Sequence, residues 1–195
     1  MTVPQGILPF KLSPDTDTSI VTSFAGLPLV LETMRALGVH TTVDETLAIK
    51  KRESGTYTES GYVESFISLF ASGGSCLDDF ARLQSDRGLK ELGLSIPSPE
   101  AARFFLYAFH EEEPLKDRPD KGAFIPPETE PLKNLLKIQE RVIARTHDRP
   151  KRATIDQDAS VIASAKDEAR PTYLGYPGYQ PVITYRAEKD MILAD

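Results

Sequence analysis

Two carboxylates, Asp156 and Asp158, stand two residues apart in the run RATIDQDASVI, residues 152–162. The rest of this run is largely apolar and β-branched, which predicts a strand. Because side chains of a strand alternate between its faces, Asp156, Asp158 and Ser160 are expected on one face. A buried carboxylate is costly without a partner, and hard cations such as Mg²⁺ take oxygen ligands. The pair therefore predicts a divalent-metal site of the kind used in phosphoryl transfer.

Basic residues gather just before this strand. A helix is predicted from residue 132 to about residue 146, with an apolar face and a basic face. Residues 133–152 hold seven basic and two acidic residues, a local charge of +5, whereas the whole chain carries −6. A basic row beside a metal site suits a phosphate backbone, although the row alone favours an ordinary solvated helix face. The candidate DNA contacts are Lys133, Lys137, Arg141, Arg145, Arg149, Lys151 and Arg152.

The first part of the chain predicts several helices with clear ends. Residues 28–36 have a helical apolar pattern, and Gly38 is placed to end it. Thr56 and Glu59 have capping-box spacing at the start of a second helix, which ends at Gly73 and Gly74. The apolar face expected for this second helix comprises Val63, Phe66, Ile67 and Phe70.

Three shorter helices are expected after it. Ser75 can cap the first, whose apolar face is Leu77, Phe80 and Leu83; the second covers residues 87–92 and ends at Gly93. Ser98, followed by Pro99, is a strong start signal for the third. Its aromatic residues lie at helical spacing without interleaved basic residues, so we expect a core role for them and not base stacking. These aromatic residues are Phe104, Phe105 and Phe109.

Other reactive residues are assigned no chemistry. Asp78 and Asp79 fall in a first helical turn, where acids favour the macrodipole, and we prefer this interpretation to metal binding. Cys76 is the single cysteine, so an internal disulfide is excluded and a reducing cytosol is expected. We expect Cys76 to be a small buried residue. No metal-ligand spacing links the histidines, which are His40, His110 and His147.

The organisation that follows is α+β. Residues 1–112 form a mainly helical region, residues 113–131 a proline-rich linker, and residues 132–195 the basic helix and the strands. After the acidic strand comes a turn-rich passage and then a hairpin, whose charged turn lies at residues 188–190. No secretory signal or membrane-spanning run is visible, so a soluble protein without a membrane partner is expected.

The run ATIDQDAS at residues 153–160, followed by GYPGYQP and MILAD, resembles the start of a known catalytic domain. This is the ribonuclease H-like domain of bacterial insertion-sequence transposases of the DDE type. The segments SFAGLPLVLETMRALG, YVESFISLFASGGSCLDDFARLQSD and IPSPEAARFFLYAF are similar to the N-terminal helical region of one such group. The resemblance covers about residues 23–195. It implies a helical region for DNA binding or dimerisation, followed by the first strands of a truncated ribonuclease H-like mixed sheet in a bacterial cytoplasmic protein.

The resemblance also implies roles for individual residues. Asp158 matches the first catalytic aspartate, with Ser160 in place of the usual threonine, and Asp156 is the alternate. In the family this aspartate, a second aspartate and a glutamate hold two Mg²⁺ ions, which promote DNA cleavage and strand transfer at the element's terminal repeats. No acid after Asp158 has the context of the other two ligands, so we expect this chain to be catalytically incomplete. The rival expectations are a truncated DNA-binding or inhibitory partner of full-length transposase, and the product of a decayed gene.

The implied fold carries an expectation about stability. A ribonuclease H-like sheet places its first strand centrally, and the later parallel strand on its far side is not expected within these residues. The backbone edge of residues 153–162 and its apolar face would then be exposed. We therefore expect marginal stability, aggregation, or pairing with another chain, either a second copy or full-length transposase.

Overall fold

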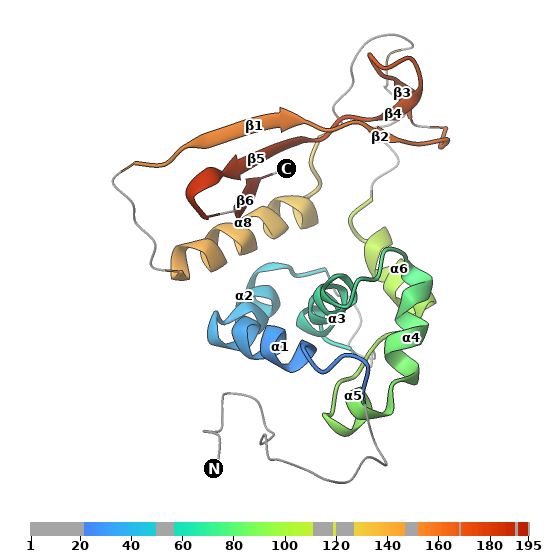
Figure 1. Ribbon diagram of the computed structural model, residues 1–195, viewed down its shortest axis with the longest axis vertical. Helices are drawn as coiled ribbons and strands as arrows, with labels where there is room; N and C mark the ends of the chain where they lie inside the picture. The colour runs from blue at the N-terminus through green and yellow to red at the C-terminus, as the bar shows by residue number, and fades with distance from the viewer. Residues whose placement is uncertain are drawn as a thin grey trace. The chain divides into compact units, whose positions relative to one another are not determined.

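A computed structural model describes residues 22–49, 57–110, 119, 127–146, 152–167, 169–189 and 191–194. The protein is α+β, with helices and small antiparallel sheets (Figure 1). It divides into two compact units. The helical unit comprises residues 1–111 and 128–146, and the strand unit comprises residues 112–127 and 147–195.

The helical unit contains short helices that follow one another along the chain. They are α1 (Leu27–Ala36), α2 (Val39–Thr46), α3 (Glu59–Ala71), the 3₁₀ turn η1 (Leu77–Asp79), α4 (Phe80–Ser85), α5 (Arg87–Glu91), α6 (Pro99–Tyr107) and α8 (Glu130–Arg145). No helix in the described part of the chain is long and apolar enough to cross a membrane.

Several predicted helix ends are confirmed. Gly38 follows α1 with φ +63° and Gly93 follows α5 with φ +76°, in the left-handed region that favours glycine. The Ser98 hydroxyl accepts a hydrogen bond from the Ala101 N–H at 3.1 Å and so caps α6. At α3 the cap is Thr58, whose hydroxyl accepts from the Gly61 N–H at 3.0 Å. Thr56, the predicted cap, lies outside the described residues.

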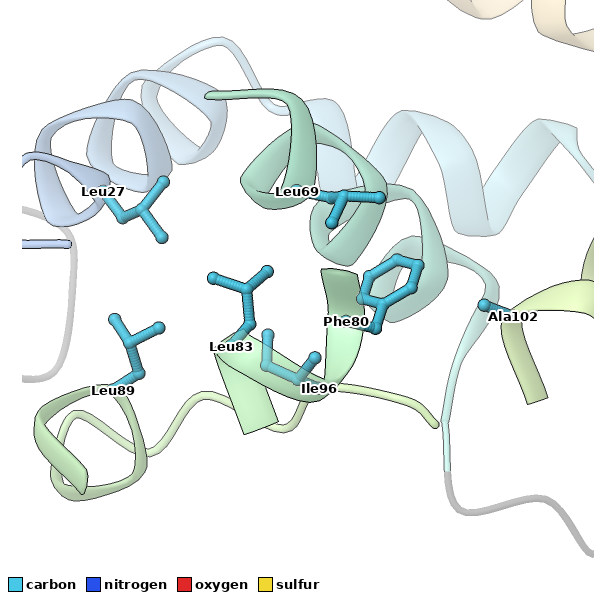
Figure 2. Packing of buried hydrophobic residues seen from close by; sticks show 7 residues of the cluster. All are labelled: Leu27, Leu69, Phe80, Leu83, Leu89, Ile96 and Ala102. Carbon is cyan, nitrogen blue, oxygen red and sulfur yellow. The ribbon is translucent and has the colours of Figure 1, made fainter. Parts of the chain in front are cut away.

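One apolar cluster joins α1, α3, α4, α5 and α6 (Figure 2). Phe80 and Leu83 of α4 are buried in it and Leu77 packs against it, which confirms the apolar face predicted for this segment. The ring of Phe80 meets the ring of Phe66 edge to face at 5.2 Å between centroids. The buried members are Leu27, Leu69, Phe80, Leu83, Leu89, Ile96 and Ala102.

A second cluster explains why α8 belongs to the helical unit. Ile138 of α8 is buried against α1, α2 and the residue that follows α2. The side chains around it are Leu31 and Met34 of α1, Val39 and Val43 of α2, and Leu47. The predicted helix is thus present, but the structure groups it with the residues before the linker. The unit boundary accordingly falls after residue 146, whereas the sequence placed residues 132–195 together.

Two predictions about buried aromatic side chains are wrong. Phe70 and Phe104 are 63% and 64% exposed, respectively. On α3 the side toward α2 carries Ser60 and Glu64, and Ser68 continues that stripe one turn further on, so the inner face is partly polar. On α6 the neighbouring Phe105 takes the inward direction and stacks on a tyrosine ring of α3 at 4.5 Å. Since adjacent helical residues point about 100° apart, Phe104 faces outward.

Cys76 is exposed, which corrects the expectation of a small buried residue. It lies directly before η1, where extended backbone precedes the first turn. Its N–H and that of Ser75 donate to the Asp79 carboxylate at 3.2 and 2.8 Å. Cys76 therefore occupies the capping position that the sequence assigned to Ser75, and this position lies at the surface.

The strand unit has two separate antiparallel sheets. The first has the order β1-β5-β6, with β1 (Ile155–Ala159), β5 (Val182–Arg186) and β6 (Met191–Ala194). The second has the order β2-β4-β3, with β2 (Ile162–Ala163), β4 (Pro177–Tyr179) and β3 (Arg170–Pro171). The predicted hairpin is confirmed as β5 and β6, joined through the 3₁₀ turn η2 (Ala187–Lys189). The passage between β1 and β5, predicted only as turns, contains the second sheet.

β1 lies at the edge of its sheet, and every residue in it is exposed. The strand is also shorter than the run of residues 152–162 that predicted it. Burial of the Asp156 and Asp158 carboxylates, which motivated the metal prediction, is therefore absent. Among the described residues, all buried apolar side chains of the core belong to the helical unit.

Candidate acidic site and basic helix

The register of β1 against β5 defines the surroundings of the two aspartates. Asp156 is paired with Tyr185 and Asp158 with Ile183. Directly paired residues of an antiparallel sheet project to the same face, as do residues two apart in one strand. Both carboxylates thus share a face with Tyr185 and Ile183. On the opposite face the Gln157 amide donates to the Thr184 hydroxyl at 3.0 Å.

The backbone of β1 is hydrogen-bonded on one side only within the described residues. The Ser160 N–H donates to Pro181 O at 3.1 Å and the Ala187 N–H to Thr154 O at 3.2 Å, which fixes the hydrogen-bonding phase. By alternation, Asp156 and Asp158 direct their backbone groups toward β5, whereas Ile155, Gln157 and Ala159 direct theirs toward the open edge.

The Asp158 side chain also covers part of that open edge. Its Oδ1 accepts a hydrogen bond from the outward Ala159 N–H at 2.9 Å. One carboxylate oxygen is therefore held in a fixed direction along the strand, and the other has no described partner. An added strand or a cation that engaged this carboxylate would have to accommodate or replace the Ala159 contact.

The acidic pair suits a magnesium ion by chemical type but supplies only part of a site. Carboxylate oxygens are the ligands Mg²⁺ prefers, and the ion commonly keeps waters and substrate phosphates beside one or two carboxylates. In the described part of the chain, no group of three or more His, Cys, Asp or Glu side chains could hold a metal. Asp156 and Asp158 could therefore hold one ion but could not complete a two-metal site.

Glu188, an acid of the hairpin turn, binds Thr154 and Arg186 and does not join the acidic pair. Its Oε1 accepts from the Thr154 N–H at 2.8 Å, and its Oε2 lies 3.8 Å from Arg186 Nε. The hydrogen bond to the Thr154 side chain, then backbone hydrogen bonds, hold the pKa of Glu188 below its usual range. Glu188 thus ties η2 to the start of β1.

The basic residues of α8 differ in what they contact. Arg145 Nη1 donates to Leu37 O, Gly38 O and Thr42 Oγ1 at 2.7, 2.8 and 2.6 Å. Arg141 Nη1 donates to Thr46 Oγ1 at 2.8 Å. Two of the candidate DNA contacts therefore bind α2 and the two residues before it.

The remaining candidates are distributed differently. Lys133 Nζ lies 2.8 Å from Glu130 Oε1, and Lys137 Nζ donates to Asn134 Oδ1 at 3.0 Å, both within α8. Arg152 is exposed in the strand unit, with Asp156 and Asp158. Arg149 and Lys151 lie outside the described residues.

A partly buried polar cluster was not foreseen from the sequence. The Glu64 carboxylate of α3 contacts His40 Nε2 of α2 and lies 3.7 Å from Arg35 Nη2 of α1. Within the described structure, His40 Nδ1 and Glu64 Oε1 are buried without a hydrogen-bond partner. No spacing rule links residues 24 positions apart on different helices, so only the packing of the helices reveals this cluster. It joins three helices, with one His40 ring nitrogen on Glu64 and the other buried.

Asp78 and Asp79 lie in the first turn of η1, as the macrodipole interpretation expects, and Asp79 also caps that turn. The Asp79 carboxylate accepts from the Ser75 and Cys76 N–H groups, and these hydrogen bonds lower the pKa of Asp79. A carboxylate engaged by backbone donors at the start of a helical turn has a local structural role.

Comparison of the chain with protein-family models, with curated proteins and with solved structures gives no match.

Proposed function

We propose that the chain is part of a DNA transposase of the DDE type, whose family chemistry is metal-dependent cleavage and strand transfer at the ends of a mobile element. One observation carries the proposal: two aspartates share a face of β1, the first strand of an antiparallel β1-β5-β6 sheet. This arrangement agrees with the start of the ribonuclease H-like sheet that the sequence resemblance implies. It supports Asp158 as the first catalytic carboxylate and Asp156 as its alternate.

In this proposal each group has a simple role. Asp158 and Asp156 supply oxygen ligands, and the Asp158–Ala159 contact holds one oxygen in place before an ion arrives. Bound Mg²⁺ would supply Lewis-acid stabilisation of the attacking and leaving oxygens. The lysines of α8, Lys133 and Lys137, together with Arg152, neutralise phosphates of the bound DNA. Two carboxylates do not fix two metal ions, so the described residues are incomplete for catalysis.

A second candidate function is a DNA-binding or inhibitory partner of full-length transposase. The observation that favours it is the uneven burial: the helical unit has its own apolar clusters, whereas the acidic strand is exposed. A chain of this kind can retain binding or pairing without retaining cleavage. The pairing partner would be full-length transposase or a second copy of this chain.

DNA binding and cleavage separate these functions. The probe is a labelled set of duplexes covering the DNA on each side of the source gene, mixed with the purified 195-residue protein with and without Mg²⁺. We expect binding that weakens steeply with salt and prefers the element's terminal repeats, without cleavage. Mg²⁺-dependent cleavage abolished by Asp158→Ala would show instead that the chain is catalytically complete. Absence of any preference for these duplexes over unrelated DNA would contradict both candidate functions.

A further inference from the structure

The basic helix α8 is held on α2 by polar contacts at both ends of α2. Near the start of α2, Arg145 Nη1 reaches Gly38 O and Thr42 Oγ1. Near its end, Arg141 Nη1 reaches Thr46 Oγ1 at 2.8 Å. Between these contacts, Ile138 is buried in the cluster shared with α1 and α2. Hydrogen bonds therefore fix the position of α8 along α2, while apolar burial provides the attraction.

Arg145 makes the most extensive of these contacts. Leu37 O lies where α1 ends, and the last carbonyls of a helix lack partners within it and favour a cation. Gly38 O, which Arg145 also reaches, accepts the Thr42 N–H at the start of α2. The chain leaves room for the guanidinium: a Cβ on Gly38 would lie 2.6 Å from Arg145 Nη1. Gly38 thus permits both the left-handed turn, at φ +63°, and the close approach of Arg145.

Lys137 lies eight residues before Arg145 on α8 and differs from it in its hydrogen bonds. Both residues are exposed, but within the described residues the Lys137 ammonium donates a hydrogen bond only to Asn134 of the same helix, at 3.0 Å. Moving Lys137 toward a phosphate would cost one exposed hydrogen bond. Moving Arg145 would release three acceptors that share the two N–H groups of Nη1, and it would uncover the end of α1.

We propose that Arg145 is a positioning residue that fixes α8 on the helical unit, and that Lys137 is a residue of α8 that contacts phosphates of DNA. Only the role of Lys137 rests on the proposed function; the role of Arg145 does not. The basic residues of α8, which recur every four positions, therefore include two kinds: one binds the protein's own carbonyl groups, and the other binds the nucleic acid.

The test compares Arg145→Met with Lys137→Met, because each removes one positive charge from α8 and keeps an unbranched apolar stem. The first readout is hydrogen exchange of the α8 amides in the full chain. The second is the salt dependence of binding to a labelled duplex of unrelated sequence. For Arg145→Met we expect α8 exchange at least about tenfold faster and an unchanged salt slope. For Lys137→Met we expect unchanged exchange and a slope smaller by about 0.9.

A further variant, Thr42→Val, removes the hydroxyl that accepts from Arg145 and donates to Gly38 O within α2, while keeping every charge on α8. We expect it to accelerate α8 exchange and leave the salt slope unchanged, which decides the positioning role even if Arg145→Met folds poorly. Native exchange in Arg145→Met together with a slope reduced by about 0.9 would overturn the proposal. An unchanged slope in Lys137→Met would overturn the role of Lys137. If the wild-type protein binds no duplex, the proposed function fails, while the exchange comparison still decides the role of Arg145.

Discussion

The helical unit and the strand unit differ in how they bury their side chains. Phe80 and Val43 of the helical unit are fully buried, whereas Ile155 of β1 and Val182 of β5 are 48% and 52% exposed. Burial of apolar surface is the main source of folding free energy. The described structure thus concentrates its stability in the helical unit and places the acidic pair where apolar burial is small. The proposed metal chemistry therefore depends on a strand held mainly by its hydrogen bonds to β5.

The largest effect should come from the centre of the helical core. Phe80→Ala removes a fully buried ring that contacts Phe66, and we expect a loss of about 3–5 kcal/mol in the free energy of unfolding. Val182→Ala, at a half-exposed position of β5, is the matched control, with an expected loss below about 1 kcal/mol. Chemical denaturation followed by helical circular dichroism measures both. Equal losses would mean that the two units do not differ as described.

The turn between α1 and α2 should be the next most sensitive position. Gly38→Ala places a side chain at φ +63° and against the Arg145 guanidinium, so we expect a loss of about 1–3 kcal/mol. Part of this loss arises from the collision, and it should shrink when Arg145→Met is combined with Gly38→Ala. A double-mutant cycle on unfolding free energies measures the coupling. Strictly additive losses would show that Arg145 is not seated on Gly38.

The helical unit also shows what the sequence could and could not predict. Local signals such as Gly38 and Ser98 depend on neighbouring residues and were found correctly. The inward faces of α3 and α6 were predicted only in part, because these helices carry more aromatic residues than their inner faces can take. Phe70 and Phe104 were therefore expected inside and lie outside.

For the candidate site, the same limit applies. The alternation that puts Asp156 and Asp158 on one face follows from strand geometry alone. The exposure of β1, the seat of Arg145 on α2 and the contact of His40 with Glu64 depend on segments far apart in the chain. Periodicity along the sequence contains no information on such pairs.

A smaller effect is expected at the start of α5, and it depends on pH. Burial raises the pKa of Asp86, but hydrogen bonds led by that from the Leu89 N–H outweigh it and bring the pKa below its usual 3.8. The folded state then binds fewer protons than the unfolded state, so this stabilisation is present above about pH 4 and is lost as the pH falls through the lowered value. Asp86→Ala should cost about 1 kcal/mol near neutral pH. Its unfolding free energy should fall less than that of the wild type on acidification.

Urea denaturation of both proteins, from pH 6 down to the lowest pH at which they fold, measures this difference in unfolding free energy. This interval includes the pH range in which carboxylates titrate. Glu100→Ala is a useful comparison, because Glu100 also lies in a first helical turn but its carboxylate is not the cap of α6. Parallel pH curves for wild type and Asp86→Ala would contradict the capping role assigned to Asp86.

The smallest effect on folding is expected at the open edge of β1. Ile155→Lys changes an exposed side chain and should alter the unfolding free energy by less than about 0.5 kcal/mol. Because a charged residue on an exposed edge opposes strand pairing, the variant should associate less than the wild type. Sedimentation velocity over a concentration series measures association. Equal association of both proteins would show that the edge of β1 is not the contact.

The central claim is that Asp156 and Asp158 form part of a magnesium site, and backbone amide NMR during Mg²⁺ addition tests it most directly. We expect saturable shifts centred on the amides of Asp156, Asp158 and Ala159, because an ion on Asp158 disturbs its contact with the Ala159 N–H. Asp158→Asn should abolish these shifts, and Asp78→Asn in the helical unit should preserve them. Shifts that leave β1 unchanged, or that persist in Asp158→Asn, would contradict the claim.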